Sequence, residues 1–144
     1  MESLHYILMK SQAVFSRQIL SQASKIGLTP GQPKVLEFLF QYKEADQKTI
    51  AAYCEIERAT VGSILLHMEE SGLITRRQKD GNRRSLYVSL TDKGRDAAIR
   101  LMDIFQKTEE QATHNLSQNE VETLKELLSK IYDNIQSPNK KVQL

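Results

Sequence analysis

The sequence has 144 residues, of which 40% are hydrophobic and 26% charged, a composition typical of one folded domain and not of a disordered chain. Its formal net charge of +2 is too small to indicate a nucleic-acid partner by itself. A single cysteine, Cys54, and the absence of a signal-peptide pattern or of about 20 consecutive apolar residues predict a cytoplasmic protein with no membrane partner.

Two helices are predicted in the first third of the chain. The first covers about residues 2–24, where apolar side chains recur at helical spacing at Leu4, Leu8, Phe15 and Ile19. The second is expected to begin at Thr29, which can act as its N-cap, with Pro30 in the first helical position. Gln32 can complete a capping box, and the apolar face of this helix ends near Tyr42.

The centre of the chain has the pattern of two helices joined by a tight turn. A short helix is predicted from a cap at Asp46 to about Tyr53, and a longer one from about Arg58 to Ser71. The longer helix places one apolar face inward, formed by Val61, Leu65 and Met68. Two helices in this arrangement predict a helix-turn-helix.

The hydrophobic period then changes from helical to alternating, which predicts a two-stranded hairpin. Residues 73–78 form the first predicted strand, residues 79–84 contain an Asp-Gly turn, and residues 86–90 form the return strand. Seven basic side chains and two acidic ones lie within residues 71–95, a local net charge of +5. A concentrated basic patch can attract phosphate although the whole chain is nearly neutral.

Two long helices are predicted after the hairpin. One runs from a cap at Thr91 to about His114, and the last runs from a capping box at residues 117–120 to Pro138. Helices of about 20 residues are about 30 Å long, too long for so small a domain to cover alone. This favours an oligomerisation surface over an intramolecular bundle. Residues 139–144 are expected to form a loose tail.

The order of these elements and several local strings resemble the MarR family, named for multiple-antibiotic-resistance regulators. The matching strings are Leu28-Thr29-Pro30 with Gln32, Ala59-Thr60-Val61, Glu69-Glu70-Ser71-Gly72-Leu73-Ile74, Asn82-Arg83-Arg84 and Val88-Ser89-Leu90-Thr91-Asp92-Lys93-Gly94-Arg95. The resemblance implies a mainly α fold with a small β-hairpin wing, a winged helix-turn-helix with N- and C-terminal dimerisation helices. The DNA-binding domain is expected at residues 28–95 and the dimerisation region at residues 1–27 and 96–138.

The resemblance also implies a function. It is that of a homodimeric, sequence-specific DNA-binding transcription regulator, usually a repressor, on a pseudo-palindromic operator in double-stranded DNA. Many members release DNA when a small aromatic or lipophilic ligand binds between the two regions, and no cofactor is expected. No nucleophile motif, Gly-rich phosphate loop or clustered pair of acids indicates an enzyme.

One position departs from the family pattern. The wing of the family often carries Asp-x-Arg, in which the acid orients the arginine. Here Asn82 occupies the position of the acid and Arg84 that of the arginine. Asn82 brings no charge, so Arg84 is expected to be held less firmly, and Asp80 is a possible substitute for the missing acid.

The predicted DNA contacts lie on the helix from Arg58 and on the hairpin. Arg58 can pair with guanine, a small Ala59 can touch a thymine methyl, and Gly62 permits close approach. Arginines at a hairpin tip suit a narrow minor groove. The full predicted set is Arg58, Ala59, Thr60, Ser63, His67, Arg77, Lys79, Asn82, Arg83 and Arg84. The competing interpretation is a solvated helix face and a charged strand edge that prevents aggregation.

Other sites are weaker hypotheses. A ligand cleft between the first, second and fifth predicted helices is suggested by four aromatic side chains, although such residues are more often core: Tyr6, Phe15, Phe38 and Phe105. Cys54 is a candidate redox switch, but Glu55 and Glu57 oppose a thiolate, and a small buried residue is the favoured role. The three histidines are too dispersed to indicate a metal site.

Two further functions remain open at this stage. A winged-helix module that binds a protein is the main alternative, for which the outward-facing Leu66 is the best indication. RNA binding is disfavoured because the basic region lacks interleaved aromatic side chains.

Overall fold

The computed structural model describes residues 1–78 and 86–136. Its elements in chain order are α1 (Leu4–Ser24), α2 (Gln32–Tyr42), β1 (Glu44–Asp46), α3 (Gln47–Cys54), α4 (Arg58–Glu70), β2 (Ile74–Gln78), β3 (Leu86–Leu90), α5 (Asp92–Ala112) and α6 (Gln118–Ile135). The predicted mainly α fold with the small sheet of a winged helix-turn-helix is confirmed. The predicted hairpin turn and the tail at residues 139–144 lie outside the described residues.

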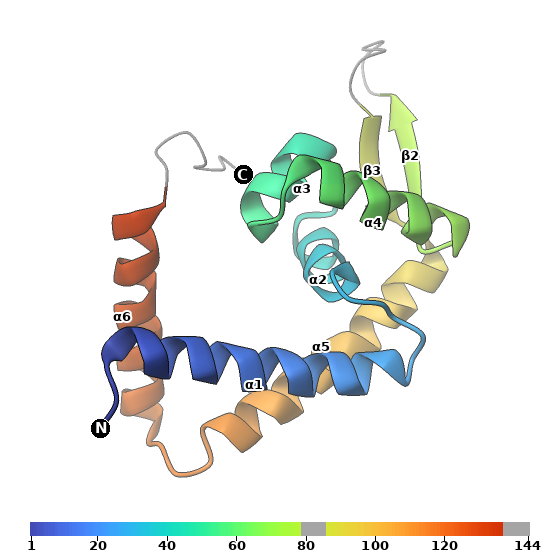
Figure 1. Ribbon diagram of the computed structural model, residues 1–144. Helices are drawn as coiled ribbons and strands as arrows, with labels where there is room; N and C mark the ends of the chain where they lie inside the picture. Colours follow the sequence, from blue (N-terminus) through green and yellow to red (C-terminus); the bar gives the residue numbers. More distant parts are fainter. Residues whose placement is uncertain (79–85, 137–144) are drawn as a thin grey trace.

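We call α2, α3, α4 and the three strands the winged body. Figure 1 shows this body above the crossing of α1 and α5, while α6 stands apart from it. Its core gathers side chains of α2, α3, α4 and the sheet, and Val35, Leu36 and Leu39 of α2 are completely or almost completely buried. The predicted inward face of α4 is confirmed, because Val61, Leu65 and Met68 have no exposed surface. Burial on this scale fixes the roll of α4, and therefore fixes which of its residues face outward.

The sheet has three strands in the order β1-β3-β2, so the prediction of two strands was incomplete. The missed strand, β1, pairs antiparallel with β3, and Ala45 lies opposite Val88. Both side chains are buried, which anchors the strand. Three residues are too few to show an alternating pattern, so only the pairing with a distant strand defines β1.

The start of α2 also differs from the prediction. Thr29 is not the N-cap and Pro30 is not the first helical residue, because the helix begins at Gln32 after Gly31. Gly31 has φ 91°, and a Cβ there would lie 2.6 Å from Cδ1 of Ile64. The predicted contact of Gln32 is nevertheless present, since its Oε1 accepts a hydrogen bond from the backbone N–H of Thr29 at 3.1 Å. Gly31 thus allows α2 to begin two residues later than predicted, with the start of the helix directly against Ile64 of α4.

The other predicted caps are confirmed. The side chains of Asp46 and Thr91 accept hydrogen bonds at the starts of α3 and α5, and Ser117 with Glu120 forms the full capping box of α6. Each cap satisfies backbone donors that the first turn leaves without a helical partner.

Candidate nucleic-acid interface

The helices α3 and α4 are joined closely at their N-terminal ends. Nε2 of Gln47 donates a hydrogen bond to the carbonyl oxygen of Arg58 at 2.9 Å. A Cβ on Gly62 would lie 3.1 Å from the same Nε2. Gly62 therefore faces α3, and the expectation that it faces a DNA partner was wrong. Its small size lets α3 approach α4 and thereby sets the position of the helix that follows the turn.

The outward face of α4 is exposed in the described chain. It carries Arg58, Ala59, Ser63, Leu66 and His67. Leu66 is 48% exposed and does not pack inward. Small, polar, basic and apolar side chains alternate on this face, so it can follow a surface that offers both hydrogen-bonding groups and methyl groups.

Thr60 is exposed too, but it lies on a different side of the helix. It lines the cavity described below together with Ile64, one turn further along α4. Thr60 thus borders the cavity and is separated from the middle of the outward face.

The two ends of α4 differ electrostatically. Glu57 is the N-cap residue but its side chain makes no capping bond. The first-turn N–H groups, including that of Ala59, therefore carry the positive end of the helix dipole without a side-chain acceptor. At the other end Glu69 and Glu70 are exposed. The free N–H groups and Arg58 favour an anionic partner at the N-terminal end, where Glu57 opposes it. At the C-terminal end Arg76, at 3.7 Å, partly offsets the charge of Glu69.

The base of the hairpin is braced by an ion pair across the sheet. Nη2 of Arg77 lies 2.8 and 3.0 Å from the two carboxylate oxygens of Glu44. Arg77 on β2 pairs with Tyr87 of β3, and Glu44 on β1 pairs with Ser89 of the same strand, so the contact spans β3. Arg77 therefore stiffens the wing base, while its side chain remains 56% exposed to solvent.

The remaining wing residues of the predicted set lie outside the described residues. They are Lys79, Asn82, Arg83 and Arg84, together with Asp80, the candidate substitute for the missing acid.

The far end of the wing base joins α5 through a close contact. Oγ1 of Thr91 donates to the carbonyl oxygen of Gly72 at 2.6 Å and accepts from the N–H of Gly94 at 3.0 Å. A Cβ on Gly94 would overlap the carbonyl oxygen of Leu73. Two of the strings that resemble the MarR family thus meet in space, and the structure gives them a mechanical role: they fix α5 to the wing. The sequence analysis treated them only as a motif.

A cavity of about 530 Å³ lies between the winged body and the long helices α1 and α5. Of the four aromatic residues predicted for a ligand cleft, Phe15 and Phe105 line it. The structure places Phe38 elsewhere, buried with its ring centroid 5.0 Å from that of Tyr42. Tyr6 is 54% exposed near the start of α1, and Nζ of Lys10 lies 5.7 Å from its ring centroid.

Two charged residues of α2 also line the cavity, and aromatic pattern alone could not have found them. Lys34 and Glu37 lie one turn apart on its wall. Partial burial, followed by the negative charge of Glu109, raises the pKa of Glu37 above its ordinary value. The cavity thus combines apolar walls with one cation and one acid of altered basicity.

Cys54 has the environment of a structural residue. It is buried, and its Sγ donates to the carbonyl oxygen of Lys34 at 3.7 Å. Burial raises the pKa of the thiol to about 11, against a smaller lowering by Lys34. A thiol that stays protonated at neutral pH is a poor redox sensor, which agrees with the favoured prediction.

The part of the chain that the structure describes has neither a membrane-spanning helix nor a metal-binding cluster. None of its helices has the length and apolar character required to cross a membrane. No group of three or more His, Cys, Asp or Glu side chains there is arranged to hold a metal ion.

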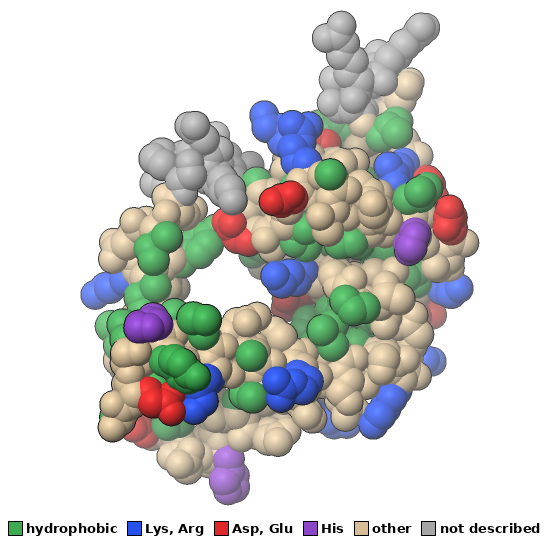
Figure 2. Space-filling view, in the orientation of Figure 1, with side chains coloured by type: hydrophobic (Ala, Val, Ile, Leu, Met, Phe, Trp, Pro, Cys, Tyr) green, Lys and Arg blue, Asp and Glu red, His purple; other side chains and the backbone are tan. Residues whose placement is uncertain are grey.

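The terminal helices present apolar side chains that nothing in the described chain covers. None of the residues of α6 is buried. Figure 2 shows hydrophobic side chains over the N-terminal part of α1 and over α6. The large exposed ones are Leu4, Tyr6, Ile7, Leu8, Met9, Val14, Phe15, Leu124, Leu127, Leu128, Tyr132 and Ile135.

Comparison with known proteins shows which family this architecture resembles. The profile of the MarR family matches residues 28–86, which include the helix-turn-helix and most of the wing. Residues 28–86 of the chain form a MarR-family domain. The HTH-type transcriptional regulator MgrA of Staphylococcus aureus is 28% identical over 90% of this chain and 88% of its own length. Members of this family are transcription regulators and not enzymes, so the chain is a MarR-family DNA-binding regulator.

Two solved structures show the same architecture. The transcriptional repressor CouR, bound to a 23-mer DNA duplex, superposes with a TM-score of 0.81 at 29% identity, covering 90% of this chain and 92% of its own. A MarR-family regulator of Listeria monocytogenes, complexed with a 26-mer DNA, has a TM-score of 0.88 at 18% identity, covering 94% and 90%. At this identity, the similarity to the Listeria monocytogenes protein shows that the two proteins share a fold.

Proposed function

We propose that this chain is a homodimeric, sequence-specific repressor that binds a pseudo-palindromic operator through α4 and the wing. The observation that carries the proposal is the exposed outward face of α4, which is held rigidly by a buried inner face and stands beside the wing base. A helix of this kind fits the major groove, with its N-terminal residues at the base edges. The repressor CouR, which has the same fold, is bound to a DNA duplex.

The exposed residues of α4 would make different contacts with DNA. Arg58, Ala59 and Ser63 contact bases or the adjacent phosphates from the N-terminal half of α4. His67 contacts the backbone from the next turn. Thr60, beside the cavity, reaches phosphate only at the edge of the interface.

In the wing, Arg77 stiffens the base through Glu44, and Lys79, Asn82, Arg83 and Arg84 supply the minor-groove contacts.

A homodimer is proposed because the apolar faces of α1 and α6 are too extensive to remain in water. A second copy of the chain would cover them and present two α4 helices to one side of a duplex. We assign dimerisation to residues 1–27 and 96–138, and DNA binding to residues 28–95. A regulator that binds an operator in this way would act in the cytoplasm.

Release by a small ligand is part of the proposal. The cavity lies against Ile64 and Thr60 of α4 and against α1 and α5, so a ligand there would contact both regions. Phe15 and Phe105 suit an aromatic or lipophilic body. Binding would oppose repression if it favours a different angle between these regions.

The test is an anisotropy titration of the purified protein against its own upstream DNA at several salt concentrations. We expect binding that weakens steeply with salt, to half-sites about 10 base pairs apart. Arg58→Ala should weaken binding about tenfold to a hundredfold, the range for one bidentate base contact, and Arg84→Ala should weaken it too. Arg17→Ala on α1 is the matched control, since it removes the same charge away from α4.

A protein-interaction module remains the second candidate, because Leu66 is exposed at the centre of the outward face. No DNA affinity at low salt, together with a salt-insensitive protein partner lost in Leu66→Ser, would support it against our proposal.

A further inference from the structure

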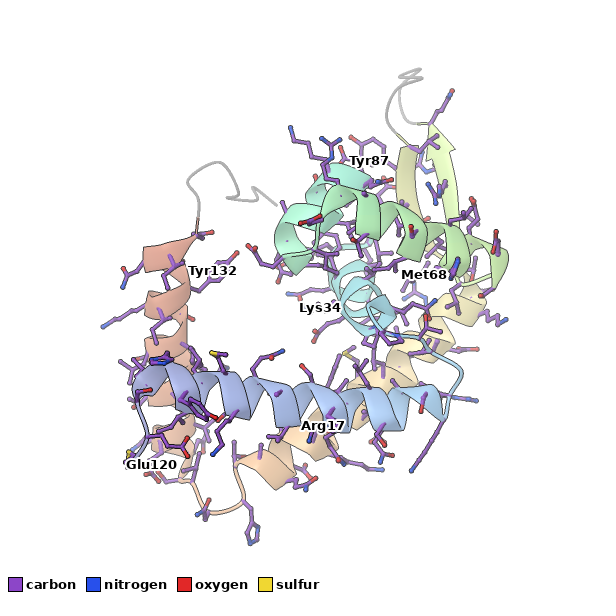
Figure 3. The ribbon with its side chains drawn as sticks, in the orientation of Figure 1. Arg17, Lys34, Met68, Tyr87, Glu120 and Tyr132 are labelled. Carbon is purple, nitrogen blue, oxygen red and sulfur yellow. The ribbon has the colours of Figure 1, made fainter. Side chains whose placement is uncertain are left out.

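A hydrogen bond joins the last helix to the turn that leads into α4. Oη of Tyr132 donates to Oε1 of Glu55 at 2.8 Å, across 77 residues of sequence. Figure 3 shows Tyr132 extending from α6 toward the winged body. The bond to the carboxylate raises the pKa of the Tyr132 hydroxyl above its ordinary value.

Glu55 is an unfavourable residue for its own position. It caps the C-terminus of α3 with φ 56°, in the left-handed region where Gly or Asn is preferred. Its negative charge also lies at the negative end of the α3 dipole. The backbone and the helix dipole at this position therefore disfavour a glutamate, and the long-range contact with Tyr132 offsets part of that cost.

This contact lies where α6 is otherwise poorly held. Within residues 86–136 and 1–78, α6 has no buried residue and does not pack extensively against any other element. Figure 2 shows an open window between α6, α1 and the winged body. The Tyr132–Glu55 bond closes one corner of that window, three residues before α4 begins at Arg58.

We propose that Tyr132 and Glu55 are positioning residues that set the angle between α6 and α4. The inference rests on the proposed function. If α6 belongs to the dimer interface, this angle determines how far apart the two α4 helices of a dimer lie. A solvent-exposed hydrogen bond is too weak to hold the fold, but it is strong enough to favour one spacing of half-sites over its neighbours.

The test uses the full-length protein and duplexes that carry its selected half-sites at the preferred spacing and at one base pair more and less. Tyr132→Phe removes only the hydroxyl. We expect the wild-type preference for its best spacing to fall about threefold to tenfold, the range for one hydrogen bond to a charged group in partial solvent. The melting temperature should remain within a few degrees of the wild-type value.

Variants of Glu55 distinguish an effect on the spacing preference from an effect on thermal stability. Glu55→Gly relieves the left-handed backbone and removes the acceptor, so it should lose spacing preference without losing thermal stability. Glu55→Gln keeps an acceptor oxygen and should restore most of the preference. Combined with Tyr132→Phe, Glu55→Gly should add nothing further, because both changes remove the same bond.

Tyr53→Phe is the matched control, since that hydroxyl lies 3.5 Å from the hydroxyl of Tyr42 within the winged body. Its spacing preference should match the wild type. Unchanged spacing preference in Tyr132→Phe with intact DNA binding would overturn this inference alone. Absence of DNA binding in the wild-type protein would overturn the proposed function instead.

Discussion

The winged body and the terminal helices differ in how much of their apolar surface is buried within the chain. In the winged body, α2 and α4 bury their apolar faces in one core that the sheet also helps to form, within one chain. The half of α1 nearest the N-terminus and the whole of α6 leave theirs in solvent. Both regions have amphipathic helices, so amphipathicity alone does not say whether a helix finds its partner within the chain or outside it. Position relative to the core decides, because α5 is longer than α6 and still buries Ala98 and Leu101, whereas α6 buries no residue.

The largest effect should come from replacing equivalent leucines in the two regions. Leu65→Ala in α4 leaves a cavity in the core and should lower the free energy of unfolding by about 3 kcal/mol at any protein concentration. Leu128→Ala on α6 should leave the winged body intact and weaken self-association, so that a higher protein concentration is needed to reach the same melting temperature. Thermal denaturation and sedimentation velocity measure the two effects. Equal, concentration-independent losses would contradict the distinction between the regions.

Substitution of Gly94 tests the contact between the wing and α5. A methyl group there overlaps the carbonyl oxygen of Leu73, so Gly94→Ala should separate α5 from the wing and lower stability by about 2 kcal/mol or more. Gly27→Ala is the matched control, because nothing lies within 4 Å of the added Cβ and only its φ of 83° opposes the change. It should be destabilised by about 1 kcal/mol. Denaturant titration followed by circular dichroism compares them, and a Gly94 variant as stable as the Gly27 variant would refute the close contact.

The burial of Cys54 in the winged body should make the stability of the protein depend on pH. Its pKa of about 11 in the folded protein lies above the ordinary value of 9.0, so the folded state holds the thiol proton more tightly than the unfolded state does. The resulting stabilisation is present below about pH 9 and is lost as the pH rises through 11. Wild type should therefore lose more stability than Cys54→Ala between pH 9 and pH 11. Parallel curves for the two proteins would show that the thiol is not buried in this way.

The smallest expected effect concerns the wing base. Arg77→Ala breaks an exposed ion pair with Glu44 and should change the free energy of unfolding by less than about 1 kcal/mol. DNA affinity should fall more than stability does, because a loosened wing base misplaces the wing. Glu44→Gln provides the comparison, since it weakens the brace and leaves the arginine available to phosphate. If Glu44→Gln leaves affinity unchanged while Arg77→Ala reduces it, Arg77 contacts DNA directly and the brace is irrelevant.

Most of the local structure could be predicted from the chain. The caps at Asp46, Thr91 and Ser117 and the inward face of α4 were all predicted, because each depends on residues within about one or two helical turns. Part of the candidate interface followed from the same pattern, since a buried inner face leaves Arg58 and Ser63 outward. Gly62 was misplaced, because helical period does not reveal that Gln47 approaches it from α3.

By itself, the sequence determined the order of the helices, the caps of α3, α5 and α6, the orientation of α4 and the resemblance to a regulator family. The tertiary structure alone decided the pairing of β1 with β3, the brace between Arg77 and Glu44, the separation of Phe38 from the cavity and the bond between Tyr132 and Glu55. The physical reason is the separation along the sequence of the residues that interact. Caps and helical faces depend on neighbouring residues, whereas contacts between residues 33 or 77 positions apart exist only after the elements pack and bring those side chains together.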